Sequence, residues 1–279
     1  MIFDTHAHYD DEQFDSDRED LLKALTASGI GAVVDVGSTP ESLDKLMAIA
    51  GTHDAVYAAV GIHPDEVGAI TDEVWNKIRD YLTYPKVVAV GEIGLDYYWD
   101  KEAHELQETW FRRQIDLAGE FDKPIIVHSR AAAEDTMRVI KDCYERTGGS
   151  GPAADSEGLP GIIHCYSYSA EMAREYVKMG FMIGVGGVVT YKNGRKLKET
   201  VQAIPLESIV LETDCPYLSP SPNRGKRNSS LNLPYVVSAI AVLKGVTEAE
   251  VEDVTWENAR RVFRLSRQDR RRGTANDTE

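Results

Sequence analysis

The sequence predicts an α/β protein folded as a single (β/α)8 barrel. Three observations lead to this expectation. The chain has 279 residues, 42% of them hydrophobic, which is enough to bury one sizeable core. It contains eight short apolar runs rich in β-branched residues, and segments with helical apolar spacing lie between most of them. Strand and helix alternation predicts a parallel sheet, and eight repeats predict a closed barrel.

The predicted elements follow one another in a regular order. The strands span residues 2–3, 32–36, 56–60, 87–90, 124–127, 161–163, 181–185 and 209–211. Helices are predicted at residues 18–28, 41–50, 72–82, 103–120, 131–146, 170–178 and 197–203, and closing helices at 234–244 and 248–265. Gly29 and Gly51 stand where we expect the first two helices to end, because glycine adopts the left-handed C-terminal conformation readily.

Two segments depart from this alternation. Residues 148–158 are rich in glycine and small polar residues, and we interpret them as an insertion before the sixth strand, on either face of the barrel. Residues 266–279 are polar and are expected to form a disordered tail. Residues 1–265 are therefore predicted to be one domain.

The charge of the chain limits its partners. A formal charge of −15 disfavours broad binding to duplex nucleic acid, since Lys and Arg usually neutralise the phosphates. It does not exclude an enzyme that holds a few nucleotides at one end, because two divalent cations would add about four positive charges locally.

The cysteines and the apolar segments indicate the cellular compartment. Cys143, Cys165 and Cys215 form no CxxC pair, which argues against a disulfide framework and a thiolate zinc site. No signal-like N-terminus and no apolar run of roughly 20 residues is present, so we expect a cytoplasmic protein without a membrane partner. Cys165 and Cys215 follow His164 and Asp214, and strand alternation predicts that both thiols face away from these neighbours and fill packing space.

Metal-ligand residue types stand at the predicted strand ends. Because the C-terminal ends of barrel strands meet at one mouth, residues far apart in sequence should share a pocket there. Imidazole nitrogens and carboxylate oxygens bind zinc, manganese and similar ions. These residues are His6, His8, His63, Glu92, His128, His164 and Asp214. The fold class is thus an α/β TIM barrel with a metal site at the C-terminal strand ends.

The pair His6-Ala7-His8 has a spacing that suits one ion. On an extended segment, residues i and i+2 point to the same side, so both imidazoles can face a single cation. A single histidine could equally be a solvated loop residue. Five of the seven histidines at strand ends, joined by Glu92 and Asp214, favour the metal interpretation.

The motifs at these strand ends resemble those of the TatD family of metal-dependent deoxyribonucleases. The resemblance runs from about residue 2 to residue 265, with the motifs in family order. They are His6-x-His8, Gly61-Ile62-His63-Pro64, Gly91-Glu92-Ile93-Gly94-Leu95-Asp96-Tyr97, His128-Ser129-Arg130, His164 and Glu212-Thr213-Asp214-Cys215-Pro216-Tyr217-Leu218. The resemblance implies a TIM-barrel hydrolase of the amidohydrolase superfamily with exonuclease activity on DNA, cytoplasmic and often single-chain.

The same resemblance implies two divalent metal ions and a role for each motif residue. One ion would be held by His6, His8, Glu92 and Asp214, and the other by Glu92, His128 and His164. Asp214 would orient or deprotonate the attacking water, and His63 would lie at the pocket wall near the attacked phosphodiester. The ligand types favour Zn or Mn, whereas the family's activity is linked to Mg, so the working metal stays open.

Substrate contacts are predicted from residues beside these motifs. The loop after the eighth strand carries Arg224, Lys226 and Arg227, and Ser129 and Arg130 follow His128, so both segments are candidates for binding phosphate. Tyr97, Tyr98 and Trp99 follow Asp96, and their rings either stack an unpaired base or pack at the barrel rim. In many relatives Glu-Pro follows the basic loop directly; here Ser229-Ser230-Leu231-Asn232-Leu233 intervenes before Pro234.

Three other functions compete with a 3′-to-5′ exonuclease on single-stranded DNA. The first is a metal-dependent deacylase of D-aminoacyl-tRNA, which the ligands alone do not separate from a nuclease. The second is a barrel that only binds, which the full set of ligand types argues against. The third is a phosphotriesterase or amide hydrolase, disfavoured because Glu92 stands where a carbamylated lysine would be expected. No obligate protein partner is indicated, and a monomer is compatible with the sequence.

Overall fold

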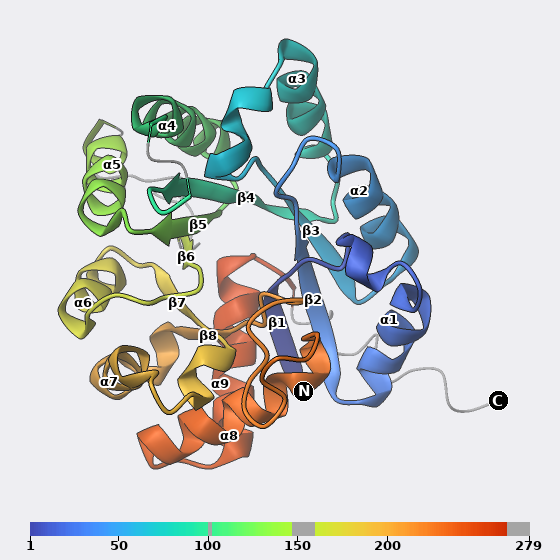
Figure 1. Cartoon of the computed structure of the whole chain (residues 1–279), viewed down its shortest axis with the longest axis vertical. Helices are drawn as coiled ribbons and strands as arrows, with labels where there is room; N and C mark the ends of the chain where they lie inside the picture. The colour runs from blue at the N-terminus through green and yellow to red at the C-terminus, as the bar shows by residue number, and fades with distance from the viewer. Residues whose placement is uncertain (100–101, 147–159, 267–279) are drawn as a thin grey trace.

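The eight predicted strands form one parallel sheet in the computed structural model, which describes residues 1–99, 102–146 and 160–266. The strands neighbour one another in sequence order from β1 to β8 (Figure 1). Their bounds are β1 Ile2–Ala7, β2 Ile30–Val36, β3 Val56–Val60, β4 Val87–Asp96, β5 Ile125–Arg130, β6 Gly161–Ile163, β7 Met182–Val185 and β8 Ile209–Leu211. This topology confirms the predicted (β/α)8 barrel.

The ends of the sheet meet between β1 and the residues that follow β8. The backbone N–H of Asp214 donates to the carbonyl of His6 at 2.9 Å, and the N–H of His8 donates to the carbonyl of Cys215 at 2.8 Å. Ala7 and Cys215 form an isolated parallel bridge between them. The segment that closes the barrel therefore also carries three of the predicted site residues.

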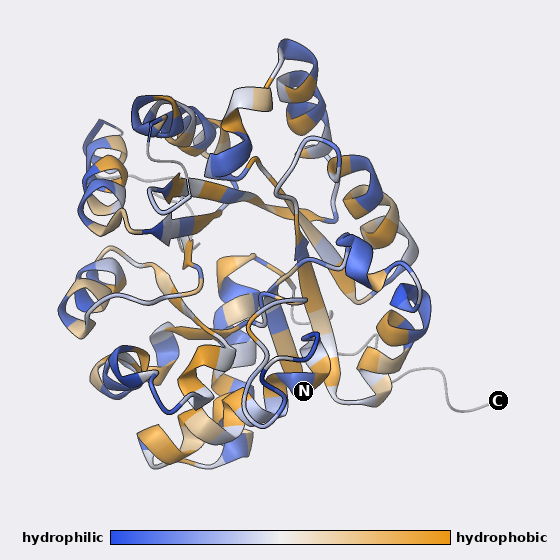
Figure 2. Ribbon diagram, viewed as in Figure 1, coloured by the Kyte–Doolittle hydropathy of each residue, from blue (hydrophilic) through white to orange (hydrophobic). Residues whose placement is uncertain are grey.

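Helices surround the sheet. Their bounds are α1 Arg18–Ala27, α2 Leu43–Thr52, α3 Asp72–Tyr81, α4 His104–Glu120, α5 Ala133–Arg146, α6 Ala170–Lys178, α7 Arg195–Ala203, α8 Leu233–Lys244 and α9 Glu248–Val262. Hydrophobic residues concentrate on the strands and on the helix sides that face them (Figure 2). Gly29 has φ +86° directly after the end of α1, as expected of a helix terminus. The prediction for Gly51 was wrong, because α2 continues through it to Thr52.

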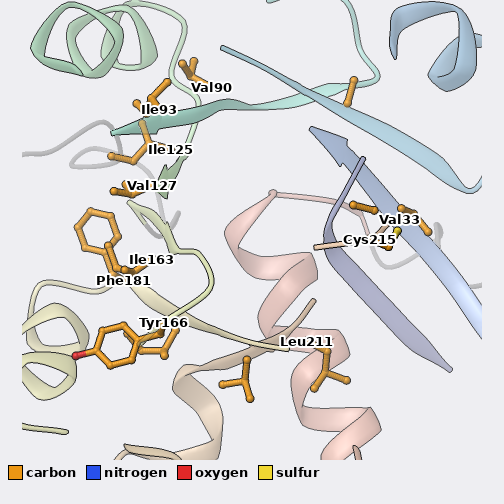
Figure 3. Packing of buried hydrophobic residues seen from close by; sticks show 14 of the residues in the cluster. Val33, Val90, Ile93, Ile125, Val127, Ile163, Tyr166, Phe181, Leu211 and Cys215 are labelled. Atoms are coloured by element: carbon orange, nitrogen blue, oxygen red, sulfur yellow. The ribbon is translucent and has the colours of Figure 1, made fainter. Parts of the chain in front are cut away.

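Alternating strand residues build two hydrophobic layers. The larger layer lies between strands and helices, and Figure 3 shows its side chains following one another from β4 through β5 and β6. The smaller layer contains Phe3 from β1 and residues of α9. The Phe3 ring lies 5.4 Å from the ring of Trp256 and 5.8 Å from that of Phe263, measured between centroids. Helix α9 therefore packs where the strands begin, and the strand ends are left for the site.

Strands β1, β4 and β5 are longer than predicted. The predicted strands ended before the segments that carry polar residues. In the structure, pairing between β4 and β5 continues through Ile93 with Val127 and Asp96 with Arg130. The polar residues Glu92 and Asp96 are buried there and belong to the sheet. The predicted insertion at residues 148–158 and residues 267–279 of the predicted tail lie outside the described residues.

Helix lengths bear on the membrane prediction. Within residues 1–99, 102–146 and 160–266, no single helix has both the length and the hydropathy to cross a bilayer. The segments Ser230–Lys244 and Glu248–Val262 reach the threshold only when taken together, and a 106° bend separates them.

Candidate metal centre

Six metal-ligand side chains from five strand ends lie together at the C-terminal mouth of the barrel. His6 lies near the end of β1 and His8 follows this strand. Glu92 lies in β4 and His128 in β5, whereas His164 follows β6 and Asp214 follows β8. Apart from His128 and Asp214, these residues are buried. Because the strands are parallel and in sequence order, residues more than two hundred positions apart become neighbours.

The first group consists of His6, His8 and Asp214. The Nε2 atoms of His6 and His8 lie 3.1 Å apart. Asp214 Oδ1 is 3.4 Å from His8 Nε2 and 3.9 Å from His6 Nε2. Three ligand atoms thus face one another across a space of ionic size.

Glu92 lies between this group and a second one. Its Oε2 is 3.5 Å from His6 Nε2 and 3.8 Å from His8 Nε2. Its Oε1 is 2.7 Å from His128 Nδ1 and 3.6 Å from His164 Nε2. Each oxygen of this one carboxylate therefore faces a different pair of imidazoles, which is the arrangement required of a bridging ligand.

Hydrogen bonds on the outer side of three imidazoles fix which nitrogen faces the centre. His8 Nδ1 lies 2.8 Å from the carbonyl of Val36, which can only accept, so Nδ1 carries a proton and Nε2 is the nitrogen that faces the centre. His164 Nδ1 is 3.2 Å from Glu212 Oε2, and His128 Nε2 is 3.1 Å from Asp96 Oδ2. Such outer partners are typical of metal-binding histidines.

The charges of the cluster keep its carboxylates ionised. Burial raises the pKa of Glu92, but the charges of His6, His164 and His128 outweigh burial and hold it well below its usual value. Burial likewise raises the pKa of Asp214, and His8 and His164 lower it to a net value below the usual one.

The histidines of the cluster differ in their protonation. Burial and the charge of His164 lower the pKa of His6 to about 4. Burial lowers the pKa of His8 as well, but Asp214 and Glu92 raise it to about 10. For His128 the carboxylates of Glu92 and Asp96 overcome burial and raise the pKa to about 9. The cluster thus pairs buried positive charge with Glu92 and Asp214, and divalent cations can take the place of that charge.

These residues fit divalent cations. The buried Nε2 atoms of His6 and His8 face each other at 3.1 Å, a contact that needs a proton or a cation between two lone pairs. Nitrogen and carboxylate donors together suit zinc, manganese and related ions. The groups His6–Glu92–His164 and His63–Glu92–His128 each place their ligand atoms within 4.8 Å of one another, as the first group does.

His63 lies at the edge of the centre. Its ring is 4.3 Å from that of His128, measured between centroids. Burial and the charge of His128 lower the pKa of His63 to about 4, so the ring is neutral at ordinary pH. Its Nδ1 accepts a hydrogen bond from the N–H of Asp65 at 3.2 Å, which leaves the proton on Nε2.

The residues predicted to bind substrate near the ends of β4 and β5 fall into two environments, one exposed and one engaged within the protein. Arg130 is exposed, and its guanidinium lies over the ring of Tyr98 at 4.1 Å and that of Trp99 at 5.3 Å. Tyr97 instead stacks on His104 and donates its hydroxyl to Asp135 at 3.2 Å. Ser129 is also engaged within the protein, since its hydroxyl is bonded to Thr136 at 2.7 Å and to Tyr168 at 3.0 Å.

The basic loop after β8 is anchored beside Asp214. Asn228 donates its side-chain amide to the carbonyl of Thr213 at 3.0 Å. Arg224 lies over the ring of Tyr191 at 4.3 Å, and the side chain of Lys226 is exposed. Arg227 is paired within the chain, since its guanidinium binds both carboxylate oxygens of Asp17.

The segment that follows the basic loop, where the sequence departs from the Glu-Pro of many relatives, contributes a buried hydroxyl. Ser230 donates to Asp4 Oδ2 at 2.7 Å and is bonded to the hydroxyl of Tyr9 at 2.8 Å. Asp4 also accepts from Thr213 at 2.7 Å. This network ties the loop to the strands that carry His6 and Asp214.

One sequence prediction about the site was wrong. Cys165 was expected to face away from the centre, but its φ of +45° breaks the strand alternation. Its Sγ lies within 4.8 Å of ligand atoms of both His164 and Asp214. Cys215, in contrast, is fully buried in the hydrophobic layer (Figure 3), as expected of a packing residue.

Glu212 and Asp96 are the site residues that sequence reasoning missed. Both stood in the quoted motifs, but neither was given a role. Glu212 is 1% exposed and receives His164 on one oxygen and the N–H of Cys165 on the other, at 2.6 Å. A carboxylate two residues before a predicted ligand, on a strand end, was the available signal.

The chain is similar over most of its length to known metal-dependent hydrolases of one family. A family model described as TatD related DNase matches residues 3–264. The Bacillus subtilis protein YabD, described as an uncharacterised metal-dependent hydrolase, is 42% identical, over 95% of this chain and 100% of its own length. The Mycobacterium tuberculosis metal-dependent hydrolase TatD is 36% identical over 95% and 98%. The crystal structure of the TatD homologue YjjV from Escherichia coli K12 has a TM-score of 0.86 at 28% identity, over 95% and 98%.

Proposed function

The chain belongs to the TatD family of metal-dependent hydrolases, and from this premise we propose that it hydrolyses phosphodiester bonds of DNA as a 3′-to-5′ exonuclease on single-stranded ends. The observation that carries the proposal is the convergence of four imidazoles with Glu92 and Asp214 beside an exposed cationic and aromatic rim. Such a centre suits hydrolysis of an anionic substrate.

Two divalent cations are proposed as cofactors, with Mg, Mn or Zn as candidates. His6, His8, Glu92 and Asp214 would hold one, and Glu92, His128 and His164 the other. When bound, such cations lower the pKa of water and neutralise charge on a phosphoryl oxygen. Asp214 is then proposed to act on the attacking water, and His63 on the attacked phosphate or the leaving oxygen.

Asp214 is proposed to accept the proton of the attacking water. Its side chain is 20% exposed, against 4% for Glu92, so Asp214 is the carboxylate of this pair that reaches the open side of the cluster. Its lowered pKa keeps it ionised at neutral pH, as a general base requires. Glu92 is buried among imidazoles and is proposed to contribute one carboxylate oxygen to each of the two cation sites.

His63 is proposed to bind the attacked phosphate or the leaving oxygen. The N–H of Asp65 occupies Nδ1, so the neutral ring presents Nε2–H as a hydrogen-bond donor. A donor beside His128 can stabilise negative charge that develops on a phosphate oxygen.

The rim formed by Tyr98, Trp99 and Arg130 supports a single-stranded substrate. The side chains of Tyr98 and Trp99 are 51% and 66% exposed, with ring centroids 4.8 Å apart. Exposed rings can stack unpaired bases, and Arg130 supplies positive charge next to them. Arg224 and Lys226 on the opposite loop are proposed as further phosphate contacts, with Ser129, Tyr97 and Arg227 supporting these segments through their internal bonds.

The test compares hydrolysis of single-stranded DNA, duplex DNA and D-tyrosyl-tRNA with Mg, Mn or Zn. We expect the highest kcat/KM on single-stranded DNA. Preferential hydrolysis of D-tyrosyl-tRNA would replace the proposal with the deacylase alternative.

Rim variants then test the mode of binding. Stacking contributes about 1–3 kcal/mol per base, so Trp99→Ala and Tyr98→Ala should each raise KM about 5- to 150-fold. Tyr84→Ala is the matched control, because Tyr84 is also 51% exposed but precedes β4 at the other end of the barrel. Equal KM for all three variants would exclude the rim as a base-binding surface.

A further inference from the structure

Cys165 reaches the centre because of its backbone conformation. Strand β6 ends at Ile163, and Cys165 then adopts φ +45°, which turns its side chain to the same pocket as its neighbour His164. Its Sγ, a nitrogen of His164 and a carboxylate oxygen of Asp214 all lie within 4.8 Å of one another. Two ligands of one tetrahedral zinc ion lie about 3.5 Å apart for the usual bond lengths, so a small shift brings the sulfur into range.

Glu212 holds Cys165 and His164 in this relation. One oxygen of its carboxylate accepts the N–H of Cys165 at 2.6 Å, and the other lies 3.2 Å from His164 Nδ1. Glu212 is itself 1% exposed. The position of the cysteine relative to the imidazole is therefore fixed by a buried group.

The other charges around the thiol come from the centre and from the rim. Burial first, and then the charges of Asp214, Glu212 and Glu92, raise the pKa of the Cys165 thiol well above its usual value, against a smaller opposite effect of Arg130. A bound cation is the group that would balance three carboxylates around a thiolate.

We propose that the Cys165 thiolate is a further ligand of the cation assigned to Glu92, His128 and His164, on the side of that site that faces Asp214, which makes the centre favour thiophilic divalent ions over Mg²⁺. On binding, the sulfur–metal bond forms and the S–H proton leaves to solvent. Thiolate is a soft donor that selects zinc and related ions, whereas Mg²⁺ takes oxygen ligands. The inference rests on the proposed metal centre but not on the identity of the substrate.

Cobalt spectroscopy tests the ligand directly. Co²⁺ bound to thiolate shows a charge-transfer band in the near ultraviolet, and bound Co²⁺ shows visible d–d bands whichever ligands hold it. The chain has three cysteines, so Cys143→Ser and Cys215→Ser are matched controls. We expect the charge-transfer band in the wild type and in both controls, and its loss in Cys165→Ser with the d–d bands retained.

Three outcomes would overturn the proposal. The first is a charge-transfer band that persists in Cys165→Ser. The second is a wild-type protein that shows d–d bands without the charge-transfer band. The third is a protein that binds no cobalt at saturating concentration, which would overturn the proposed centre as well.

A competition experiment tests the selectivity. Loss of even an outer partner of a metal ligand typically costs about 10- to 100-fold in affinity. Cys165→Ser should therefore weaken Cd²⁺ binding by at least about 10-fold while leaving Mg²⁺ affinity unchanged, as measured by calorimetry. Equal losses for both ions would show that the variant disturbs the pocket generally and would contradict a ligand role.

Discussion

Replacing Glu212 with glutamine tests whether the outer hydrogen bonds set the affinity for metal. Glu212→Gln keeps the shape of the side chain and an oxygen that can accept from Cys165. It removes the negative charge 3.2 Å from His164 Nδ1. His164 should then hold its tautomer and its orientation toward Glu92 less firmly.

The size of the effect follows from burial. The side chain of Glu212 is 1% exposed and that of His164 is 3% exposed, so water cannot replace the lost bond. A hydrogen bond to a charged group contributes about 1.5–3 kcal/mol. At about 1.4 kcal/mol per factor of ten, metal affinity should fall about 10- to 150-fold.

Calorimetric titration of the metal-stripped protein with Mn²⁺ or Zn²⁺ measures this loss. Gly184→Ala should also lower the affinity for metal, because an added Cβ would lie 2.7 Å from Glu212 Cδ and displace the carboxylate. Gly119→Ala in α4 is the matched control, because open space surrounds that position. Unchanged affinity in folded Glu212→Gln would refute the role of this hydrogen bond.

Three further predictions concern the centre and the stability of the fold. Glu92→Ala should abolish hydrolysis because it loosens both metals. Asp214→Asn should lower kcat about 10²- to 10⁴-fold with an unchanged circular dichroism spectrum, and full activity of this variant would contradict the role of Asp214 as base. Divalent cations at about 100 times their Kd should stabilise the fold by about 2.7 kcal/mol and raise its Tm. EDTA should reverse this rise in Tm, and an equal rise in Tm for Glu92→Ala would contradict binding at this centre. Hydrogen bonds from Arg138 and Arg112 outweigh partial burial and lower the pKa of Glu108 to about 2. The contribution of Glu108 to the stability of the fold is therefore present above pH 4.5, its ordinary pKa, and is lost as the pH falls through about 2. Urea denaturation should show Glu108→Gln less stable than the wild type by about 1 kcal/mol at neutral pH, and this difference should vanish only as the pH falls below about 2, the folded pKa of Glu108. A difference independent of pH would contradict this account.

The barrel and the membership of the cluster could be predicted from the sequence. Parallel strands in sequence order force their ends into one mouth, so His6 and Asp214 had to approach each other once the alternation was recognised. The chemical type of each residue at a strand end then indicated metal binding without any knowledge of distances. Strand lengths were harder to predict, because buried polar residues such as Glu92 interrupt the apolar pattern that marks a strand.

The orientations of side chains could not be predicted. Cys165 was assigned to the wrong side because alternation assumes an extended backbone, and a positive φ in a non-glycine residue leaves no sequence signal. The outer roles of Glu212 and Asp96 depend on which imidazole nitrogen each carboxylate meets. Exposed arginines raise the same difficulty, since Arg227 is paired with Asp17 from a segment over two hundred residues away.

The most direct test of the nuclease proposal follows single-stranded DNA labelled at its 5′ end during incubation with the wild type and with Glu92→Ala. Mg, Mn or EDTA is added in parallel reactions. We predict stepwise shortening from the 3′ end that requires a divalent cation and disappears in Glu92→Ala. Intact DNA with every metal, in a protein that demonstrably binds the ions, would contradict the proposal and direct attention to aminoacyl-tRNA or another ester.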